Sequence, residues 1–485
     1  MSKFQSLEAF GQGEEYELLP FKFDRFDDNQ YILTNMAGEY LLIDSNVIPA
    51  LIKRELSPEH PSFSSLRSRH FLRYPQEKAP LELLALKVRT KYSRLPSFTN
   101  LHIFVVTLRC DHSCPYCQVS RQMEGAGSFD MTREMADKSL DFVFRSPNPA
   151  IKIEFQGGEP LLNFEMVKYV VLEAKKRNET QKRDLQFVIA TTLSLLTDEI
   201  LAFCKEHSIL LSSSLDGPRE LHNANRPRKG RDSHERFESG LNRARETLGY
   251  DQVSALMTTT DKSLPNVKAI IDEYLRLGFT GIFLRSLSPY GFAIKTNKFH
   301  RYDTERWLDF YREGLQYILE LNKSGVRFVE HYSATVLKKI LTCEDPGYVD
   351  LMNPAGAGIA AIVFNYDGAV YASDESRMLA EMGDETFKLG NVLTNSYEEV
   401  MLSDQLLDAL EGSFTLSAPM CSECAYEPFC GADPVFHHAM SKDVLGRKSE
   451  SSFCKRNMSI FKHLIDLMRA DKQTKNIFLG WANGC

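Results

Sequence analysis

Residues 107–118 have the sequence TLRCDHSCPYCQ, which places Cys110, Cys114 and Cys117 close together on one short stretch. The apolar run at 101–108 just before them predicts a buried strand. Three thiolates at this spacing can hold three irons of a [4Fe–4S] cluster, and because such clusters normally take four cysteines, one iron is left for another ligand. A zinc site is the alternative, with His112 as the available fourth ligand. The stretch therefore predicts a metal centre at the end of a strand.

Further apolar runs alternate with amphipathic stretches after this loop. The run at 151–155 ends in Gly157-Gly158-Glu159-Pro160, where glycines let the backbone approach a ligand closely and the acid can bind an ammonium group. The run at 209–214 ends in Ser214-Leu215-Asp216-Gly217-Pro218. The remaining expected strands are 186–190, 252–257 and 281–284, and the expected helices are 133–144, 164–176, 198–206, 234–247 and 266–277. This alternation predicts parallel βαβ units, whose ligands gather at the carboxyl ends of the strands.

The cysteine spacing, the GGEP stretch and the SLDGP stretch together resemble the radical S-adenosylmethionine (SAM) enzymes. The resemblance implies an α/β fold, a partial (βα)6 TIM-like barrel over residues 96–325. It also implies that SAM binds the open iron and that an electron from the cluster releases a 5′-deoxyadenosyl radical. The residues that it places around SAM are Tyr116, Gly157, Gly158, Glu159, Ser214 and Asp216.

A second group of cysteines lies in the last third of the chain, at Cys421, Cys424, Cys430 and Cys454. Four thiolates accept either zinc or an iron–sulfur cluster, so composition leaves both open. The segment 326–485 resembles the cysteine-rich SPASM extension of peptide-modifying radical SAM proteins, which usually binds two auxiliary [4Fe–4S] clusters. Ser373 and Pro434 stand where that pattern has cysteines, and residues 353–358 offer no thiol. The resemblance therefore implies one auxiliary [4Fe–4S] cluster. It also makes Asp374 the candidate catalytic residue, whose carboxylate accepts a proton.

The first 95 residues have a different texture. Runs at 16–23, 30–34 and 39–43 predict three short strands, and 47–54, 62–72 and 81–91 predict three helices. This order resembles the small winged-helix elements that capture leader peptides by adding a strand to a sheet edge. A general α+β packing domain is the alternative. The expected division is thus 1–95, 96–325 and 326–485.

Composition excludes several classes of function. The chain has 485 residues and a net charge of −7, so it lacks the overall positive electrostatic potential that attracts nucleic acid. No apolar run is long enough for a transmembrane helix, and the N-terminus lacks the apolar core of a signal peptide, so a cytoplasmic protein is expected. Cys204, Cys343 and Cys485 stand alone; Cys204 is expected in a helix core and Cys485 as an exposed thiol.

Longer phrases narrow the resemblance. VTLRCDHSCPYCQVSR, EFQGGEPLLNF and NYDGAVYASDESRMLAEMGD resemble the radical SAM maturases of the His-Xaa-Ser system. That family implies a precursor peptide with His-Xaa-Ser repeats as the substrate, a second radical SAM maturase as a partner, and a reductant such as ferredoxin or flavodoxin. Two alternatives remain, a sulfatase-type maturase that oxidises a single residue and a non-catalytic scaffold that delivers peptide to another enzyme.

Overall fold

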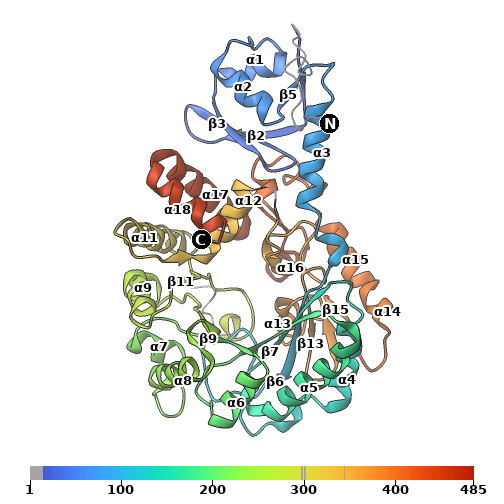
Figure 1. Cartoon of the computed structure of the whole chain (residues 1–485), viewed down its shortest axis with the longest axis vertical. Coiled ribbons are helices and arrows are strands. Elements are labelled where there is room, and N and C mark those ends of the chain that lie inside the picture. Colours follow the sequence, from blue (N-terminus) through green and yellow to red (C-terminus); the bar gives the residue numbers. More distant parts are fainter. Residues whose placement is uncertain (1–14, 297–298, 300–301, 343, 485) are drawn as a thin grey trace.

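A mixed eight-stranded sheet forms the centre of the molecule (Figure 1). The computed structural model describes residues 15–484 except 297–298, 300–301 and 343, so Cys343, Cys485 and the N-terminal stretch 1–14 lie outside the described residues. The strand order is β10-β9-β8-β7-β6-β13-β14-β15. Its parallel half consists of β6 (Leu101–Thr107), β7 (Ala150–Gly157), β8 (Asp184–Ala190), β9 (Leu210–Ser214) and β10 (Val253–Leu256).

Two of the helices between these strands, α4 and α6, begin at threonine side chains that cap them. Thr132 accepts a hydrogen bond from the Met135 N–H at the start of α4, and Thr197 accepts one from the Ile200 N–H at the start of α6. Each helix buries one apolar face against the sheet, as the amphipathic pattern predicts. The helices are α4 (Arg133–Val143), α5 (Phe164–Gln181), α6 (Asp198–Glu206), α7 (Arg219–Asn225), α8 (Ser233–Leu248) and α9 (Val267–Arg276).

The expected sixth strand of the barrel differs from the prediction. Only Gly281–Ile282 form a strand, β11, and it pairs with β12 (Val329–Glu330) in a separate two-stranded sheet. The Leu284 N–H donates to the Glu330 Oε1 (3.0 Å), so a side chain takes the place of a neighbouring strand there. The Thr259 N–H donates to the Arg285 carbonyl (3.0 Å). This bond keeps the segment after β11 beside the segment after β10.

Three later strands continue the central sheet on the other side of β6. They are β13 (Ala361–Phe364), β14 (Ala369–Tyr371) and β15 (Lys388–Asn391). β13 runs parallel to β6, with Ile362 opposite His102, while β14 and β15 are antiparallel. Residues on both sides of the expected boundary at 325/326 therefore share one sheet and one hydrophobic core.

The N-terminal region has its own small core, which includes Leu33, Leu51 and Phe71. A Lys22–Glu427 ion pair (2.9 Å) and a hydrogen bond from the Thr34 hydroxyl to the Ala425 carbonyl (2.6 Å) attach it to the C-terminal cysteine segment. Its elements are β1 (Glu17–Leu18), β2 (Phe21–Arg25), β3 (Gln30–Asn35), β4 (Tyr40–Asp44), α1 (Val47–Lys53), α2 (Pro61–Ser68), β5 (Leu72–Arg73) and α3 (Ala79–Lys91). β2, β3 and β4 form an antiparallel sheet, and β1 pairs with β5.

Among the remaining helices, α11, α12, α16, α17 and α18 lie between the central sheet and the N-terminal region, whereas α14 and α15 lie beside β15 at the edge of the sheet (Figure 1). In the part of the chain that the structure describes, none of the helices combines the length and the apolar character needed to cross a bilayer. The remaining helices are α10 (Phe292–Lys295), α11 (Thr304–Lys323), α12 (His331–Leu341), α13 (Asp374–Ala380), α14 (Tyr397–Met401), α15 (Asp404–Gly412), α16 (Pro434–Ser441), α17 (Ser452–Ala470) and α18 (Lys472–Ala482).

Candidate active site

The loop that carries Cys110, Cys114 and Cys117 follows β6 at its carboxyl end, and all three thiols are half-buried. Backbone bonds hold the loop from several sides. The Cys110 N–H donates to the Gln122 carbonyl (3.1 Å), and the Phe292 N–H donates to the Cys117 carbonyl (2.7 Å). The loop is therefore fixed on both flanks at the carboxyl end of the parallel strands.

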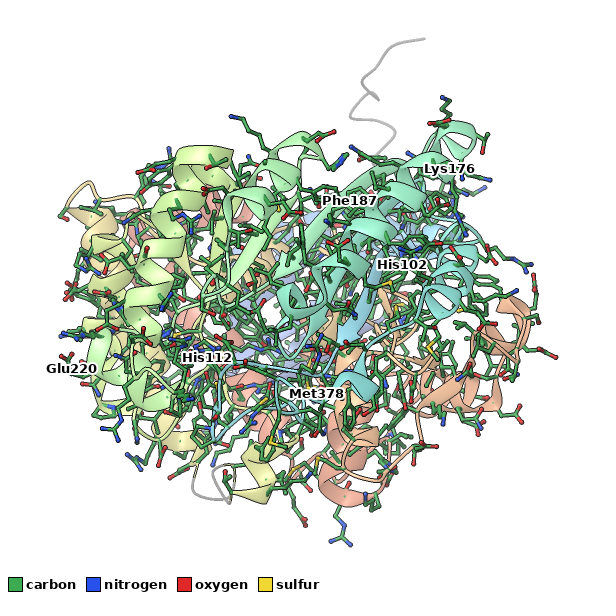
Figure 2. The ribbon with its side chains drawn as sticks, turned by 90° about the horizontal axis from the view of Figure 1, so that it is seen from below. His102, His112, Lys176, Phe187, Glu220 and Met378 are labelled. Atoms are coloured by element: carbon green, nitrogen blue, oxygen red, sulfur yellow. The ribbon has the colours of Figure 1, made fainter. Side chains whose placement is uncertain are left out.

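The geometry of this loop does not suit a single zinc ion. Within the described chain, the one group of three potential ligand atoms lying within 4.8 Å of one another is at Cys110, Asp111 and His112. That closeness comes from hydrogen bonding, since the His112 Nδ1 lies 2.7 Å from the Asp111 Oδ1 and its Nε2 lies 2.8 Å from the Ser233 Oγ. His112 is buried inside the molecule (Figure 2) with both ring nitrogens engaged, and is therefore not free to complete a tetrahedral site.

The two glycines of the GGEP stretch face protein backbone. A Cβ at Gly157 would lie 1.8 Å from the Thr107 carbonyl oxygen, and a Cβ at Gly158 would lie 2.2 Å from the Arg109 carbonyl oxygen. The Gly158 N–H donates to the Thr107 carbonyl (2.9 Å). The glycines thus let the end of β7 press against the residues that begin the cysteine loop.

Glu159 is fully buried and its carboxylate is satisfied by protein groups. It accepts hydrogen bonds from the Thr191 hydroxyl (2.8 Å), from the Thr192 N–H and hydroxyl (both 2.8 Å), and from the Leu161 N–H (3.1 Å). Burial raises the pKa of this carboxyl above its usual range. The side chain therefore ties the end of β7 to the end of β8.

Asp216 makes the equivalent connection on the other side. Its Oδ2 accepts a hydrogen bond from the Tyr116 hydroxyl (2.5 Å) and lies 3.1 Å from the Arg226 Nε, while its Oδ1 accepts a bond from the Thr258 N–H (3.3 Å). Ser214 is the last residue of β9 and is half-buried beside it. Tyr116 belongs to the cysteine loop, so these contacts fix the loop to β9 and β10.

A continuous set of hydrogen bonds runs around the cysteine loop from the Glu159 carboxylate to the backbone of Asp216. Thr192 bonds Ser194 (2.8 Å), Ser194 donates to Asp111 (2.7 Å), and His112 and His222 share the Ser233 hydroxyl (2.8 and 3.1 Å). The His222 Nδ1 accepts from the Asp216 N–H (3.3 Å). Sequence inspection did not single out Ser194 or Ser233, because each is one serine in a loop or helix start with no spacing to mark it.

The second group of cysteines surrounds a cavity of about 440 Å³ that all four thiols line. Cys421, Cys424 and Cys430 come from one irregular segment, and Cys454 lies in the first turn of α17. No three of these sulfurs lie within 4.8 Å of one another in the described structure, whereas zinc would draw all four to about 2.3 Å from one point. Burial raises the pKa of Cys430 to about 12, so a metal must displace the proton there. The size of the cavity and its donor set fit an iron–sulfur cluster.

Two of the positions that lack a cysteine lie at the starts of helices. Ser373 caps α13 through a reciprocal pair of hydrogen bonds with Ser376, and Pro434 is the buried first residue of α16. Asp374 begins α13, where the Arg377 Nε lies 3.2 Å from its Oδ1. The structure thus places the candidate catalytic acid beside a buried guanidinium and outside both groups of cysteines.

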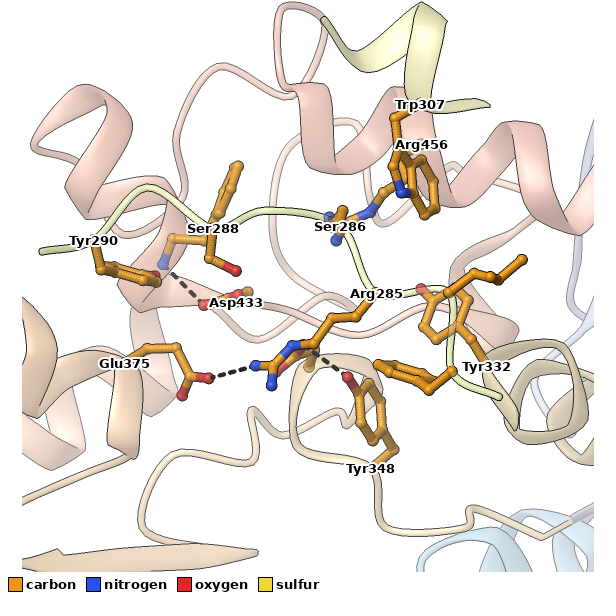
Figure 3. Close-up of a pocket in the computed structure, with 14 residues that line it drawn as sticks. Arg285, Ser286, Ser288, Tyr290, Trp307, Tyr332, Tyr348, Glu375, Asp433 and Arg456 are labelled. Carbon is orange, nitrogen blue, oxygen red and sulfur yellow. Dashed lines mark hydrogen bonds and ion pairs between the residues drawn. The ribbon is translucent and has the colours of Figure 1, made fainter. Parts of the chain in front are cut away.

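Figure 3 shows a further polar pocket, which sequence inspection missed. Its volume is about 40 Å³. Arg285 comes from the segment after β11, Glu375 from α13 and Asp433 from the start of α16. The lining residues are Phe283, Leu284, Arg285, Ser286, Ser288, Tyr290, Trp307, Tyr332, Tyr348, Asp350, Glu375, Asp433, Phe436 and Arg456.

Sequence comparison now places the parallel half of the sheet in a known class. Residues 104–266 match the family model of the Radical SAM superfamily, and the chain therefore carries a radical SAM domain. The match implies a [4Fe–4S] cluster and SAM as cofactors. An uncharacterized protein of Methanocaldococcus jannaschii, MJ0907, is 29% identical over 39% of this chain and 62% of its own length, which is somewhat less than two thirds.

Relatives with a stated activity match more of the chain at lower identity. A cysteine-type anaerobic sulfatase-maturating enzyme of Clostridium perfringens is 22% identical over 66% of this chain and 84% of that protein. The structure described as native anSMEcpe with bound AdoMet has a TM-score of 0.62 and 18% identity, over 78% of this chain and 99% of its own. Streptococcus suis SuiB bound to its precursor peptide SuiA has a TM-score of 0.53 and 14% identity, over 90% and 98%. These two structures share the fold of this chain.

Proposed function

We propose that this chain is a radical SAM enzyme that modifies a ribosomally synthesised peptide. The observation that carries the proposal is the cysteine loop at the carboxyl end of β6, clamped between the glycines of β7 and the Asp216–Tyr116 contact. Ligands of parallel α/β sheets bind at this end of the strands. The loop therefore presents its three thiols where a cofactor and a substrate can meet.

Each sequence-predicted residue has a role in the proposal. Cys110, Cys114 and Cys117 hold the cluster that binds SAM, while Tyr116, Gly157, Gly158, Glu159, Ser214 and Asp216 shape the surrounding space. When bound, the cluster and SAM supply a 5′-deoxyadenosyl radical that abstracts hydrogen from the peptide. The buried side chains around the loop exclude water, which protects such chemistry from side reactions.

The C-terminal site has a separate role. Cys421, Cys424, Cys430 and Cys454 hold one auxiliary [4Fe–4S] cluster, and since protein supplies all four ligands, this cluster relays electrons or stabilises the fold and does not bind substrate. Asp374 accepts a proton from the substrate, with its carboxylate oriented by Arg377.

The proposed substrate is a precursor peptide with His-Xaa-Ser repeats, supported by the phrases that resemble maturases of that system. A second radical SAM maturase and a ferredoxin- or flavodoxin-like reductant are the proposed partners. The region 15–95 is the proposed peptide-capture element, because its sheet β2-β3-β4 stands apart from the central sheet. A sulfatase-type maturase is the second candidate, favoured by the match to the Clostridium perfringens enzyme.

Cofactor content and SAM cleavage test the proposal. After anaerobic reconstitution, about eight irons per chain are expected, falling to about four in a Cys110/Cys114/Cys117→Ala variant that no longer forms 5′-deoxyadenosine with a chemical reductant. About four irons falling to none, with zinc present, would make the C-terminal site a zinc site. Intact 5′-deoxyadenosine formation in the triple variant would contradict the proposal. Incubation with a His-Xaa-Ser peptide or a sulfatase-derived peptide, followed by mass spectrometry, separates the two substrates.

A further inference from the structure

The polar pocket of Figure 3 is lined by two acids that lie close in sequence to positions without the expected cysteine. Glu375 follows Ser373 by two residues, Asp433 directly precedes Pro434, and both acids line the same cavity. The positions where the resemblance places ligands of a second auxiliary cluster therefore flank a group of charged side chains in this protein.

The charges of this pocket do not balance. Asp350, Glu375 and Asp433 contribute three carboxyl groups, whereas Arg285 and Arg456 contribute two guanidinium groups, which leaves one negative charge in excess when all are ionised. Arg285 lies 3.8 Å from Glu375. Among the described residues, none forms an ion pair with Asp350 or Asp433. An uncompensated charge in a partly desolvated site favours the binding of one cation.

The pocket also holds polar groups that lack partners. The Tyr290 hydroxyl and the Trp307 Nε1 form no hydrogen bond with any described residue, although the two side chains are 1% and 2% exposed. Buried polar groups are nearly always paired in folded proteins, so unpaired ones that line a cavity indicate a ligand. The Tyr290 oxygen can accept a hydrogen bond from a cation, and the Trp307 N–H can donate one to a peptide carbonyl.

Aromatic walls and size restrict what fits. Phe283, Tyr332 and Tyr348 pack edge to face around one side, with ring centroids 5.6 to 6.1 Å apart. Aromatic faces beside carboxylates attract organic cations. The volume of about 40 Å³ exceeds the roughly 10–15 Å³ that one water needs, and it accommodates the end of a side chain rather than a whole residue. The Arg285 side chain lines this pocket and is 34% exposed.

The pocket adjoins the proposed reaction site. Its wall continues from Arg285 through Tyr290 to Phe292, whose N–H donates to the Cys117 carbonyl (2.7 Å). On the opposite side, Asp433 follows Cys430 by three residues. A peptide anchored here would pass between the two cysteine groups and beside the loop of Cys110, Cys114 and Cys117.

We propose that this pocket binds a cationic side chain of the peptide substrate, with Asp433 and Glu375 as its counter-ions. This inference rests on the proposed function, because that function is what makes the ligand a peptide. The charges of the pocket attract a cation whichever bond the enzyme forms in the peptide. The pocket thereby selects peptides that carry a basic residue near the modified position.

Binding of short peptides tests this selection. The chain has two tryptophans, so Trp481→Phe leaves Trp307, inside the pocket, as the sole emitter. At about pH 9, where the carboxyl groups of the pocket are ionised, titrating the reconstituted protein with acetyl-Gly-Lys-Gly-amide is expected to change Trp307 emission, with a Kd about tenfold or more below that of the norleucine peptide of similar shape. Calorimetry on the unsubstituted protein checks the same affinities without the Trp481 change.

Two conservative variants locate the effect. Asp433→Asn and Glu375→Gln each should reduce the preference for lysine over norleucine to less than about threefold. Asparagine preserves the cap of α16, in which the Asp433 carboxylate accepts the Phe436 N–H (2.8 Å), so this variant is expected to fold. Glu398→Gln, an identical change at an exposed site, should leave the preference unchanged.

Three outcomes would overturn the proposal. The first is tighter binding of a glutamate peptide, which would make Arg285 the centre of an anion pocket. The second is equal binding of the lysine and norleucine peptides, and the third is no binding of any peptide. Formation of 5′-deoxyadenosine, measured in the same preparations, tests the proposed function separately. A protein that cleaves SAM but does not prefer the lysine peptide contradicts this inference alone.

Discussion

At Gly158 the molecule has no space for a side-chain carbon. An added Cβ would lie 2.2 Å from one backbone oxygen and 2.5 Å from another, and backbone cannot move aside as a flexible side chain can. We expect Gly158→Ala to lower the free energy of unfolding by about 1–3 kcal/mol. We also expect it to displace the cysteine loop, so that iron content falls from about eight to about four per chain.

Gly127→Ala is the matched control for this change, because nothing lies within 4 Å of the Cβ that it adds. Urea denaturation and iron determination on both variants compare the two glycines directly. Equal iron content in the two proteins would show that the close contact at Gly158 does not position the loop.

Asp216 is the second residue with a large expected effect. Asp216→Asn keeps the shape but removes the charge that faces the buried Arg226 guanidinium, 3.1 Å away. Leaving one partner of a buried ion pair uncompensated costs about 3–5 kcal/mol. We expect a shift of the urea midpoint that corresponds to a loss of this order. Glu398→Gln, which breaks an exposed pair with Arg145, should cost less than about 1 kcal/mol.

The residues that the sequence could reveal are those with a characteristic spacing. The thiols of both groups stand close together in the chain, so their chemistry is visible before folding. Arg285, Glu375 and Asp433 could not be recognised, because each is a single charged residue on a different segment and only the tertiary fold brings them into one pocket. Glu159 and Asp216 could be located, but their full hydrogen bonding with protein groups was not foreseeable.

The start of α16 couples folding to pH through Asp433. Burial and the nearby Asp350 raise the pKa of Asp433 to about 8, and the same causes raise that of Glu375 to about 7. Arg456 and Arg285 oppose these shifts. An unfolded carboxyl has a pKa of about 4, so between these values the folded protein binds more protons. The free energy of unfolding should therefore fall as pH rises from about 5 to about 8.

Urea denaturation across this range measures that dependence. Asp433→Asn removes one titrating group and keeps the helix cap, so its stability should change less with pH than that of the parent protein. A parent protein whose stability rises over the same range would contradict the assignment. The cationic peptide should have the opposite dependence and bind more tightly at the higher pH, because it favours the ionised carboxyls.

Among the elements, helices were the most predictable. The five expected barrel helices coincide with α4, α5, α6, α8 and α9, because amphipathic periodicity and capping residues are local signals. In the N-terminal region the expected run 16–23 forms two strands, β1 and β2, and β5 lies between α2 and α3. β11 is shorter than expected, since the Glu330 side chain and β12 replace its neighbour. The pairing of β13 with β6 is not encoded locally and could not be inferred.

On the scale of the whole molecule, the C-terminal cysteine segment holds the N-terminal region in place. Lys22 and Thr34 contact Glu427 and Ala425, and the Lys91 ammonium donates to the Pro428 carbonyl (2.9 Å). A cluster at Cys421, Cys424, Cys430 and Cys454 would therefore stiffen the surface on which this region sits. Loss of this cluster should weaken the contact of Lys91 with Pro428 and make the chain around residue 91 more accessible.

Limited trypsin digestion tests this link. Cys454→Ser should lower iron by about four per chain and accelerate cleavage after Lys91 or Arg94 several-fold. The Cys110/Cys114/Cys117→Ala variant loses a similar amount of iron from the other centre and should be cleaved at the parental rate. Equal acceleration in both variants would show that general destabilisation, not the C-terminal site, exposes the connection.

The pairing of β13 with β6 has a consequence for how the protein is made. β6 leads directly into the first cysteine loop. One edge of β6 nevertheless stays unpaired until β13, which begins only at Ala361, has been synthesised. An uncovered strand edge can pair with other chains, so a nascent chain that stops near residue 325 should aggregate instead of folding. Insertion of the first cluster is therefore expected only after β13 has emerged from the ribosome, late in the synthesis of the sequence that carries the loop.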